Sequence, residues 1–371
     1  MAGIYVHIPY CHSKCAYCDF YSTPKGPDRR KFVESLTREW KMRRHETGHE
    51  TVRTIYLGGG TPSILSAEEL SAITAPLPKE NIEEFTIEAN PEDVNRDLVR
   101  NIISLGINRV SIGVQSLHDS ELHAVRRRHT AQEALDAIRT LHEVGITNVS
   151  ADLIYGLPGQ TLSTWRDSLE RLIGSGITHL SAYALSYEPG TRLYAMLQAG
   201  KITEAPQELS EEMYMTLCAT ASAAGFTHYE ISNFALPGMH SRHNSSYWDY
   251  TPYLGLGPGA HSFDGMVRRV NPSRLPAYIE AMTVGTTFYE TEEETLTDRI
   301  NDAIITGLRT LKGLRLDTIH GLGGQRAVDE LQRNAMQFIR SGKVTVSDNT
   351  LRIPERYWLV SDAILRELLI D

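Results

Sequence analysis

The stretch CHSKCAYCDF, residues 11–20, contains three of the four cysteines in this 371-residue chain. Cys11, Cys15 and Cys18 follow one another with the spacing C-x3-C-x2-C. Thiolates this close in sequence can converge on one iron–sulfur cluster, and three of them cover three corners of a [4Fe–4S] cube. The fourth iron then has no protein ligand. The spacing therefore predicts a cluster with one iron open to a small molecule.

Other uses of cysteine fit this stretch less well. A structural zinc site usually has four ligands in two spaced pairs, and the sequence has no second pair, although His7 and His12 are near enough to complete a zinc set. A disulfide framework needs an even set of cysteines and an oxidising compartment. Cys218 lies apart in the helical pattern SEEMYMTLCATASAAGF. We expect it on the apolar side of that helix, as a small core residue.

The composition bounds the class of protein. With 41% hydrophobic residues, the chain can bury a large core divided over two or three domains. It has no run of about 18 apolar residues, and its start, MAGIYVHIPY, lacks the basic and apolar segments of a signal peptide. We therefore expect a cytoplasmic protein. The net charge of −9 argues against a general nucleic-acid binder.

Short β-branched segments alternate with longer helical patterns in the first half of the chain. We expect strands near residues 4–8, 54–57, 85–89, 110–114, 148–153 and 179–185. We expect helices near residues 30–44, 67–75, 96–105, 131–144 and 161–173. This alternation predicts a parallel sheet with right-handed crossovers. Six units are fewer than the eight of a closed barrel, so the pattern favours a partial (β/α)6 barrel.

Polar or glycine residues follow the expected strands where these end. The cysteine loop follows the first strand and Gly58–Gly60 the second, Glu88 and Asp152 close the third and fifth, and Gln115 follows the fourth. The glycines match no phosphate-binding motif, but they let the backbone approach a ligand closely. Ligand sites of parallel barrels gather at the carboxyl ends of the strands. We expect these residues to share one site.

A C-x3-C-x2-C run directly after the first strand resembles the signature of the radical S-adenosylmethionine superfamily. The resemblance implies a partial (β/α)6 barrel that binds a [4Fe–4S] cluster, with S-adenosylmethionine at the open iron. In that superfamily the loop after the second strand meets the amino group of S-adenosylmethionine, which makes Gly60 and Thr61 expected cofactor contacts. An electron from the cluster would cleave a carbon–sulfur bond and give a 5′-deoxyadenosyl radical.

Further positions are similar to the porphyrin-handling branch, the oxygen-independent coproporphyrinogen III oxidases and their relatives. The matching cofactor-binding positions are Tyr5, Tyr17, Glu88, Gln115, Arg127 and Asp152. By this resemblance Tyr17 lies against the adenine region. Arg127 would pair with the methionyl carboxylate and Glu88 with the ammonium group. Asp152 and Gln115 would bind the ribose hydroxyls, in either order.

Residues 243–248 read HNSSYW, which resembles the H-N-x-x-Y-W motif of a heme-chaperone branch of this family. A heme carrier needs an imidazole as an axial iron ligand and flat aromatic surface to cover the macrocycle. His243 would supply the ligand, and Tyr247 and Trp248 the surface. His240 and His261 are the alternative ligands.

Two features differ from the oxidases of this family. Phe20 stands where they carry a further cysteine, and only ten residues precede Cys11, where they have a substantial segment. The resemblance therefore implies a chaperone that binds heme and delivers it to hemoproteins. The alternative is an oxygen-independent coproporphyrinogen III oxidase that decarboxylates propionate side chains with the radical, and a structural-zinc protein without cofactor is a third reading. No catalytic residue is assigned, and enzyme activity stays open.

The family also implies partners and an architecture. The recipients would be respiratory hemoproteins, with peripheral contact to the membrane, and flavodoxin or ferredoxin would supply electrons if radical chemistry occurs. We expect the radical S-adenosylmethionine core at residues 1–207, a connecting region with the heme motif at 208–271, and a C-terminal domain at 272–371. Its closing helix–hairpin–helix pattern resembles a mainly helical, winged-helix-like module. The acidic net charge argues against nucleic acid as its partner.

Overall fold

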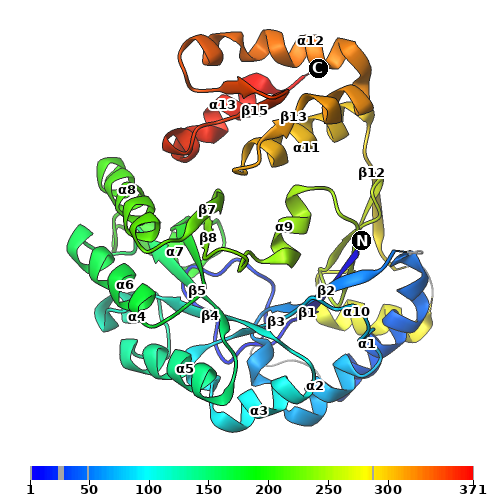
Figure 1. Cartoon of the computed structure of the whole chain (residues 1–371). Helices are drawn as coiled ribbons and strands as arrows, with labels where there is room; N and C mark the ends of the chain where they lie inside the picture. The colour runs from blue at the N-terminus through cyan, green and yellow to red at the C-terminus, as the bar shows by residue number, and fades with distance from the viewer. Residues whose placement is uncertain (1, 24–28, 48–49, 286–287, 371) are drawn as a thin grey trace.

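The computed structural model describes residues 2–23, 29–47, 50–285 and 288–370. Its first six strands pair in parallel and in sequential order, and form the curved sheet at the centre of Figure 1. Their bounds are β1 (Ala2–Ile8), β2 (Val52–Gly59), β3 (Glu84–Ala89), β4 (Arg109–Gln115), β5 (Asn148–Tyr155) and β6 (His179–Ala184). The predicted partial (β/α)6 barrel is confirmed.

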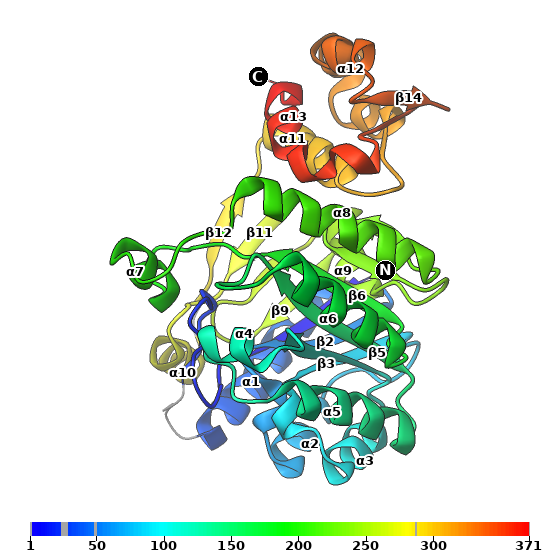
Figure 2. The same cartoon turned by 90° about the vertical axis from the view of Figure 1, so that its left-hand side faces the viewer.

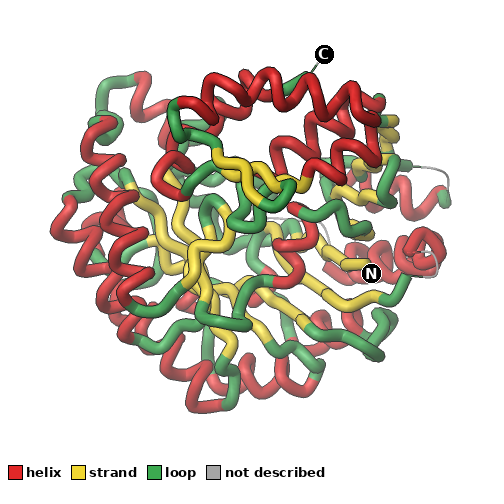
Figure 3. Tube along the Cα trace, turned by 45° about the horizontal axis from the view of Figure 1, so that its top comes forward, coloured by secondary structure: helices red, strands yellow, loops and turns green. Residues whose placement is uncertain are grey.

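Helices cover the outer face of this sheet, as the red tubes around the yellow strands in Figure 3 show. They are α1 (Arg29–Arg43), α2 (Ala67–Thr74), α3 (Arg96–Ser104), α5 (Ala131–Val144), α6 (Leu162–Gly174) and α8 (Gln207–Ala223). The short helices α4 (Asp119–Ala124) and α7 (Arg192–Gln198) lie beside the cysteine loop, and η1 (Arg44–Thr47), η2 (Pro62–Ile64) and η3 (Pro91–Asp93) are 3-10 turns in the connections. Parallel strands need such cover because both of their faces are buried. On β1, Ile4 and Val6 are 0% and 1% exposed. Capping boxes at Ser66 and Thr130 fix the starts of α2 and α5.

The sheet continues beyond the six strands at both edges. β8 pairs antiparallel with β6, and β9 pairs in parallel with β1. The added strands are β7 (Thr227–Glu230), β8 (Asn233–Ala235), β9 (Tyr253–Leu256), β10 (His261–Phe263), β11 (Val267–Val270) and β12 (Glu290–Glu293). Residues 208–271 are thus continuous with the barrel sheet, whereas the expected domain boundaries at 207 and 271 stay a prediction.

A mainly helical domain follows β12, as predicted. In Figure 2 it lies above α8. Its elements are α11 (Leu296–Leu308), β13 (Leu314–Arg315), α12 (Leu316–Arg340), β14 (Thr345–Ser347), β15 (Thr350–Arg352), η4 (Glu355–Val360) and α13 (Ser361–Leu368). Backbone hydrogen bonds tie it to the barrel, from Ile231 N to Arg309 O at 3.1 Å and from Leu311 N to Tyr229 O at 3.0 Å.

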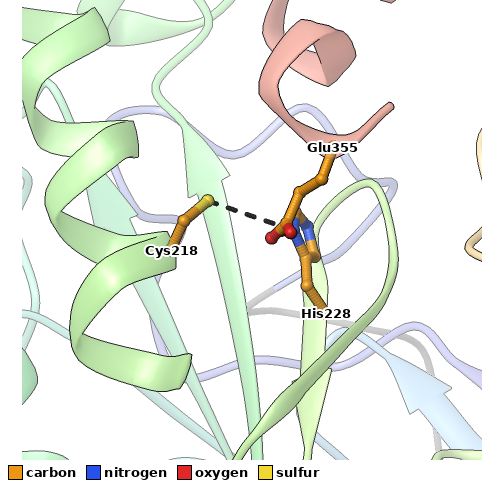
Figure 4. Close-up of side chains that lie close together, drawn as sticks. All are labelled: Cys218, His228 and Glu355. Atoms are coloured by element: carbon orange, nitrogen blue, oxygen red, sulfur yellow. Dashed lines mark hydrogen bonds and ion pairs between the residues drawn. The ribbon is translucent and has the colours of Figure 1, made fainter. Parts of the chain in front are cut away.

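A side-chain contact joins the same two parts. His228 Nδ1 on β7 lies 2.7 Å from Glu355 Oε1 on η4, and the Cys218 Sγ of α8 lies 4.0 Å from the same nitrogen (Figure 4). Trp358 packs edge-on against the His228 ring at 4.4 Å between centroids. Cys218 is half-buried against the hydrophobic core, which agrees with its predicted packing role.

Two further helices complete the fold. α9 (Arg242–Trp248) contacts β2 on one side and α11 on the other, and Figure 1 shows it between the barrel and the C-terminal domain. α10 (Leu275–Val284) packs on α1. Among the helices that the structure describes, none is both long and apolar enough to cross a membrane.

Candidate functional site

A cavity of about 690 Å³ opens where the barrel strands end, and we call it the cluster cavity. Ten of the residues predicted from the sequence line its wall. They are Cys11, Cys15, Tyr17, Cys18, Gly60, Thr61, Glu88, Gln115, Arg127 and Asp152. They come from the cysteine loop, from the ends of β2, β3, β4 and β5, and, for Arg127, from the turn after α4, so the parallel sheet brings most of them together.

The three cysteines lie on a loop that returns to the first strand. Thr23 N–H donates to Pro9 O at 2.8 Å and closes the loop, and Cys18 N–H donates to Cys15 O at 3.3 Å. All three thiols are free, and burial raises the pKa of the Cys18 thiol. Three sulfur donors on one short loop, facing a cavity with room for a further ligand, fit the donor set of a [4Fe–4S] cluster.

Arg127 brings a positive charge to the cysteine loop. Its Nη2 donates to Asn90 Oδ1 at 2.7 Å and to Gly113 O at 2.6 Å, and its Nη1 lies 3.4 Å from Cys15 Sγ. The Nε atom is buried and has no hydrogen-bond partner among the described residues. A guanidinium held this firmly at the cavity wall fits a carboxylate ligand.

Glu88 and the glycine loop form a further part of the wall. The Glu88 carboxylate accepts hydrogen bonds from Tyr56 Oη at 2.9 Å and from Gly59 N at 3.0 Å, and burial raises its pKa to about 7. Gly60 is required by a close approach, because a Cβ there would lie 2.4 Å from Tyr10 O. The glycine therefore lets the second loop pack against the cysteine loop, and Thr61 N–H donates to Tyr10 O at 2.6 Å.

Gln115 and Asp152 lie on neighbouring strands. The register of β4 against β5 shifts between Gly113 and Gln115, and Gln115 has a φ of 68°. Such bulges redirect side chains at sheet ends, and here Gln115 reaches the cavity wall. Burial raises the pKa of Asp152 to about 6, and its carboxylate accepts a hydrogen bond from Ser111 at 3.4 Å.

Two predicted residues, Tyr5 and His243, are not among the described residues that line the cluster cavity. Tyr5 Oη is hydrogen-bonded to His7 Nδ1 at 3.1 Å, and its ring stacks on His243 at 6.5 Å between centroids. His243 is 1% exposed. Its Nδ1 is hydrogen-bonded to Thr54 Oγ1 at 2.9 Å and its Nε2 to Tyr247 Oη at 3.0 Å. Direct contacts of these two residues with cofactor or heme stay predictions.

Comparison with known proteins places the chain in a family. The radical SAM superfamily model matches residues 5–172, and the HemN C-terminal domain model matches residues 295–360. The heme chaperone HemW of Bacillus subtilis (strain 168) is 35% identical over 322 residues, which cover 85% of each chain. HemW of Mycobacterium tuberculosis (strain H37Rv) is 32% identical over 378 residues, 99% of this chain and 94% of that relative. The chain belongs to the HemW family.

Membership of the HemW family confirms the resemblance seen in the sequence. The radical SAM superfamily implies a [4Fe–4S] cluster and S-adenosylmethionine as cofactors, and the cluster cavity has the donors for both. The solved coproporphyrinogen III oxidase HemN from Escherichia coli shares 22% identity, with a TM-score of 0.84 over 99% of this chain and 90% of that one. At this identity the similarity supports the fold alone.

Some residues of the cluster cavity, and of the contact between the barrel and the C-terminal domain, carried no usable sequence signal. Tyr183, at the end of β6, lines the cluster cavity, but tyrosine is common in β-strands whatever its role. The Glu355 contact to His228 joins segments 127 positions apart. Only the folded chain brings such residues together.

Proposed function

We propose that this chain is a heme chaperone, which binds heme and delivers it to hemoproteins. The proposal is carried by the similarity along nearly the whole chain to proteins named heme chaperone HemW. Phe20 supports it too. This residue is 70% exposed and lines the cluster cavity. It stands at the position where the similar coproporphyrinogen III oxidases carry a further cysteine.

We propose the following roles at the cluster cavity. Cys11, Cys15 and Cys18 would hold the [4Fe–4S] cluster, which when bound supplies an electron to S-adenosylmethionine. Arg127 would orient the methionyl carboxylate and Glu88 the ammonium group. The remaining wall residues would hold the nucleoside, with Tyr17 near the adenine, Gln115 and Asp152 at the ribose, and Gly60 and Thr61 along the backbone.

The H-N-x-x-Y-W segment, which forms α9, is the proposed heme-binding region. To ligate iron through its own ring, His243 would have to break the hydrogen bond to Thr54 or the one to Tyr247. Trp248 is half-buried on the side of α9 that faces α11. A flat indole in this place suits the face of a macrocycle.

The proposed delivery of heme implies partners and a cellular location for the chain. Respiratory hemoproteins are the proposed recipients, and the chain would work in the cytoplasm with peripheral contact to the membrane. Flavodoxin or ferredoxin would reduce the cluster if radical chemistry takes place. Nucleic acid has no proposed role, since the chain carries a net charge of −9.

A hemin titration of the anaerobically reconstituted protein tests this function. We expect a saturable Soret band near about one heme per chain, because α9 offers one aromatic platform. His243→Ala shows whether the predicted ligand is the actual one. Two results together would contradict the chaperone function and support the oxidase function. They are the absence of saturable hemin binding in the native chain and the release of methionine and 5′-deoxyadenosine during turnover of coproporphyrinogen III.

A further inference from the structure

A second cavity, of about 950 Å³, lies between the barrel and the C-terminal domain, and we call it the interdomain cavity. Its barrel side is formed by β7, α9 and the segment before α9, and its other side by α11, the start of α12 and the small C-terminal sheet. Ligand cavities in proteins commonly have volumes of about 300–1,000 Å³. No described residue lines both this cavity and the cluster cavity, so the two are separate sites.

We propose that heme binds in the interdomain cavity with His240 as its iron ligand, which rests on the proposed heme-chaperone function. His240 is the one histidine among the described residues that line this cavity. It lies on a bend between β8 and α9, two residues after Gly238, whose φ is 80°. No helix or strand includes this residue, and binding would require its ring to turn toward the ligand.

The hydrogen bonds of His240 and His243 distinguish the roles of these two residues. His240 Nε2 is buried and has no hydrogen-bond partner among the described residues, whereas both ring nitrogens of His243 are hydrogen-bonded. An imidazole nitrogen that has no hydrogen-bond partner is available to bind iron. His243 instead anchors α9 to β2, and so holds Trp248 against the cavity.

The aromatic and apolar lining suits a macrocycle. Tyr229 lies edge-on to the His240 ring at 4.4 Å between centroids, and Trp248 lines the same cavity from α9. Leu314 and Leu322 face them from the C-terminal domain. A flat apolar ligand placed between these walls would contact both parts of the protein at once.

The charges of the lining suit two propionates. Five basic side chains and only two carboxylates line the cavity, although the chain as a whole has a net charge of −9. The basic residues are Arg242, Arg299, Lys312, Arg315 and Arg352. Arg242 and Arg315 already pair with Glu83 and Asp317. Arg299 and Lys312 have no ion-pair partner among the described residues, so they are free to bind the carboxylates of the ligand.

Hemin titrations of single variants test His240 as the iron ligand. We expect His240→Ala to weaken hemin binding at least about tenfold and to remove the spectral signature of a histidine-ligated heme. Added imidazole should restore that signature, because a small imidazole can enter the space of the lost ring, whereas it would not repair a misfolded protein. The matched control is His261→Ala, since His261 lies on β10 outside the cavity and its loss should leave binding unchanged.

A second pair of measurements tests the cavity itself. Arg299→Gln with Lys312→Gln should weaken hemin binding several-fold but leave the binding of hemin dimethyl ester unchanged, since the ester has no propionate charge. Thr318→Trp places a large side chain in the cavity from α12 and leaves His240 unchanged. It should also reduce hemin binding.

The outcomes separate the two proposals. If native protein binds no hemin, the proposed function fails. If native protein binds hemin, but His240→Ala and Thr318→Trp bind it equally well, the chaperone stands and this heme site is wrong.

Discussion

The pH dependence of S-adenosylmethionine binding tests the proposed role of Glu88. Burial raises the pKa of this carboxyl to about 7. A carboxyl with that pKa is about 10% ionised at pH 6 and about 90% ionised at pH 8. Only the ionised form attracts an ammonium group, so protonation on the acid side weakens binding. The contribution of this side chain to affinity should therefore grow about tenfold from pH 6 to pH 8.

Equilibrium dialysis of the reconstituted protein measures this contribution. The dissociation constant of S-adenosylmethionine is determined for the native chain and for Glu88→Gln at a series of pH values. The ratio of the two constants cancels the titration of the ligand's own amino group, which both proteins meet alike. Glutamine keeps the size of the side chain and an acceptor for the Tyr56 hydroxyl. We expect the ratio to rise about tenfold between pH 6 and pH 8.

A matched variant makes the assignment specific. The pKa of Asp152 is raised to about 6, also by burial, so the ratio for Asp152→Asn should change mainly below pH 7. A Glu88→Gln ratio that stays constant within about twofold from pH 6 to pH 8 would refute the reasoning. In that case either the carboxyl is already ionised at pH 6, or it does not contact the ammonium group.

Three further predictions follow from the described contacts. Arg127→Leu should weaken S-adenosylmethionine binding about 10- to 100-fold in the same dialysis assay, since a charge-assisted hydrogen bond contributes about 1.5–3 kcal/mol, whereas the exposed Arg128→Leu should not change it. Cys15→Ser should lose the iron content and charge-transfer absorbance of the reconstituted protein, and Cys218→Ser should keep both. Glu355→Gln should lower the free energy of unfolding at pH 7 by at most about 1 kcal/mol, because the Glu355 side chain is 48% exposed. Its hydrogen bond to a histidine lowers the pKa of this carboxyl, so the difference from native protein should vanish as the pH falls through that lowered value.

Each of these has a result that contradicts it. Equal losses of affinity in the Arg127 and Arg128 variants would mean that a general loss of positive charge, not a specific contact, is responsible. Full iron content in Cys15→Ser would exclude this thiol as a cluster ligand. A Glu355→Gln difference that persists in acid would show that the hydrogen-bonded carboxylate is not its source.

The barrel could be predicted because its signals are local. Each strand is a short β-branched segment and each helix has its own periodicity, so six βα units are visible without any long-range information. The same holds for the cluster cavity, because strand ends of a parallel sheet meet at one edge. Ten predicted residues therefore line one cavity.

The heme region shows where sequence reasoning ends. The motif at residues 243–248 gives residue types, but not the direction in which each ring points. His243 packs into the barrel because Thr54 and Tyr247 supply partners for both of its nitrogens. The pairing of β9 with β1 joins residues about 250 positions apart, and such non-local pairings leave no periodic signal. The interdomain cavity, whose walls come from both parts of the chain, could not be predicted for the same reason.

Transfer of heme to an acceptor tests the central claim most directly. The reconstituted chain is loaded with hemin, separated from excess, and mixed with an apo-cytochrome whose Soret band differs from that of the loaded chain. The account predicts that the band of the loaded chain decays while that of the cytochrome rises by the same amount of heme. A chain that holds no hemin after separation, or that holds it without ever passing it on, would contradict the account.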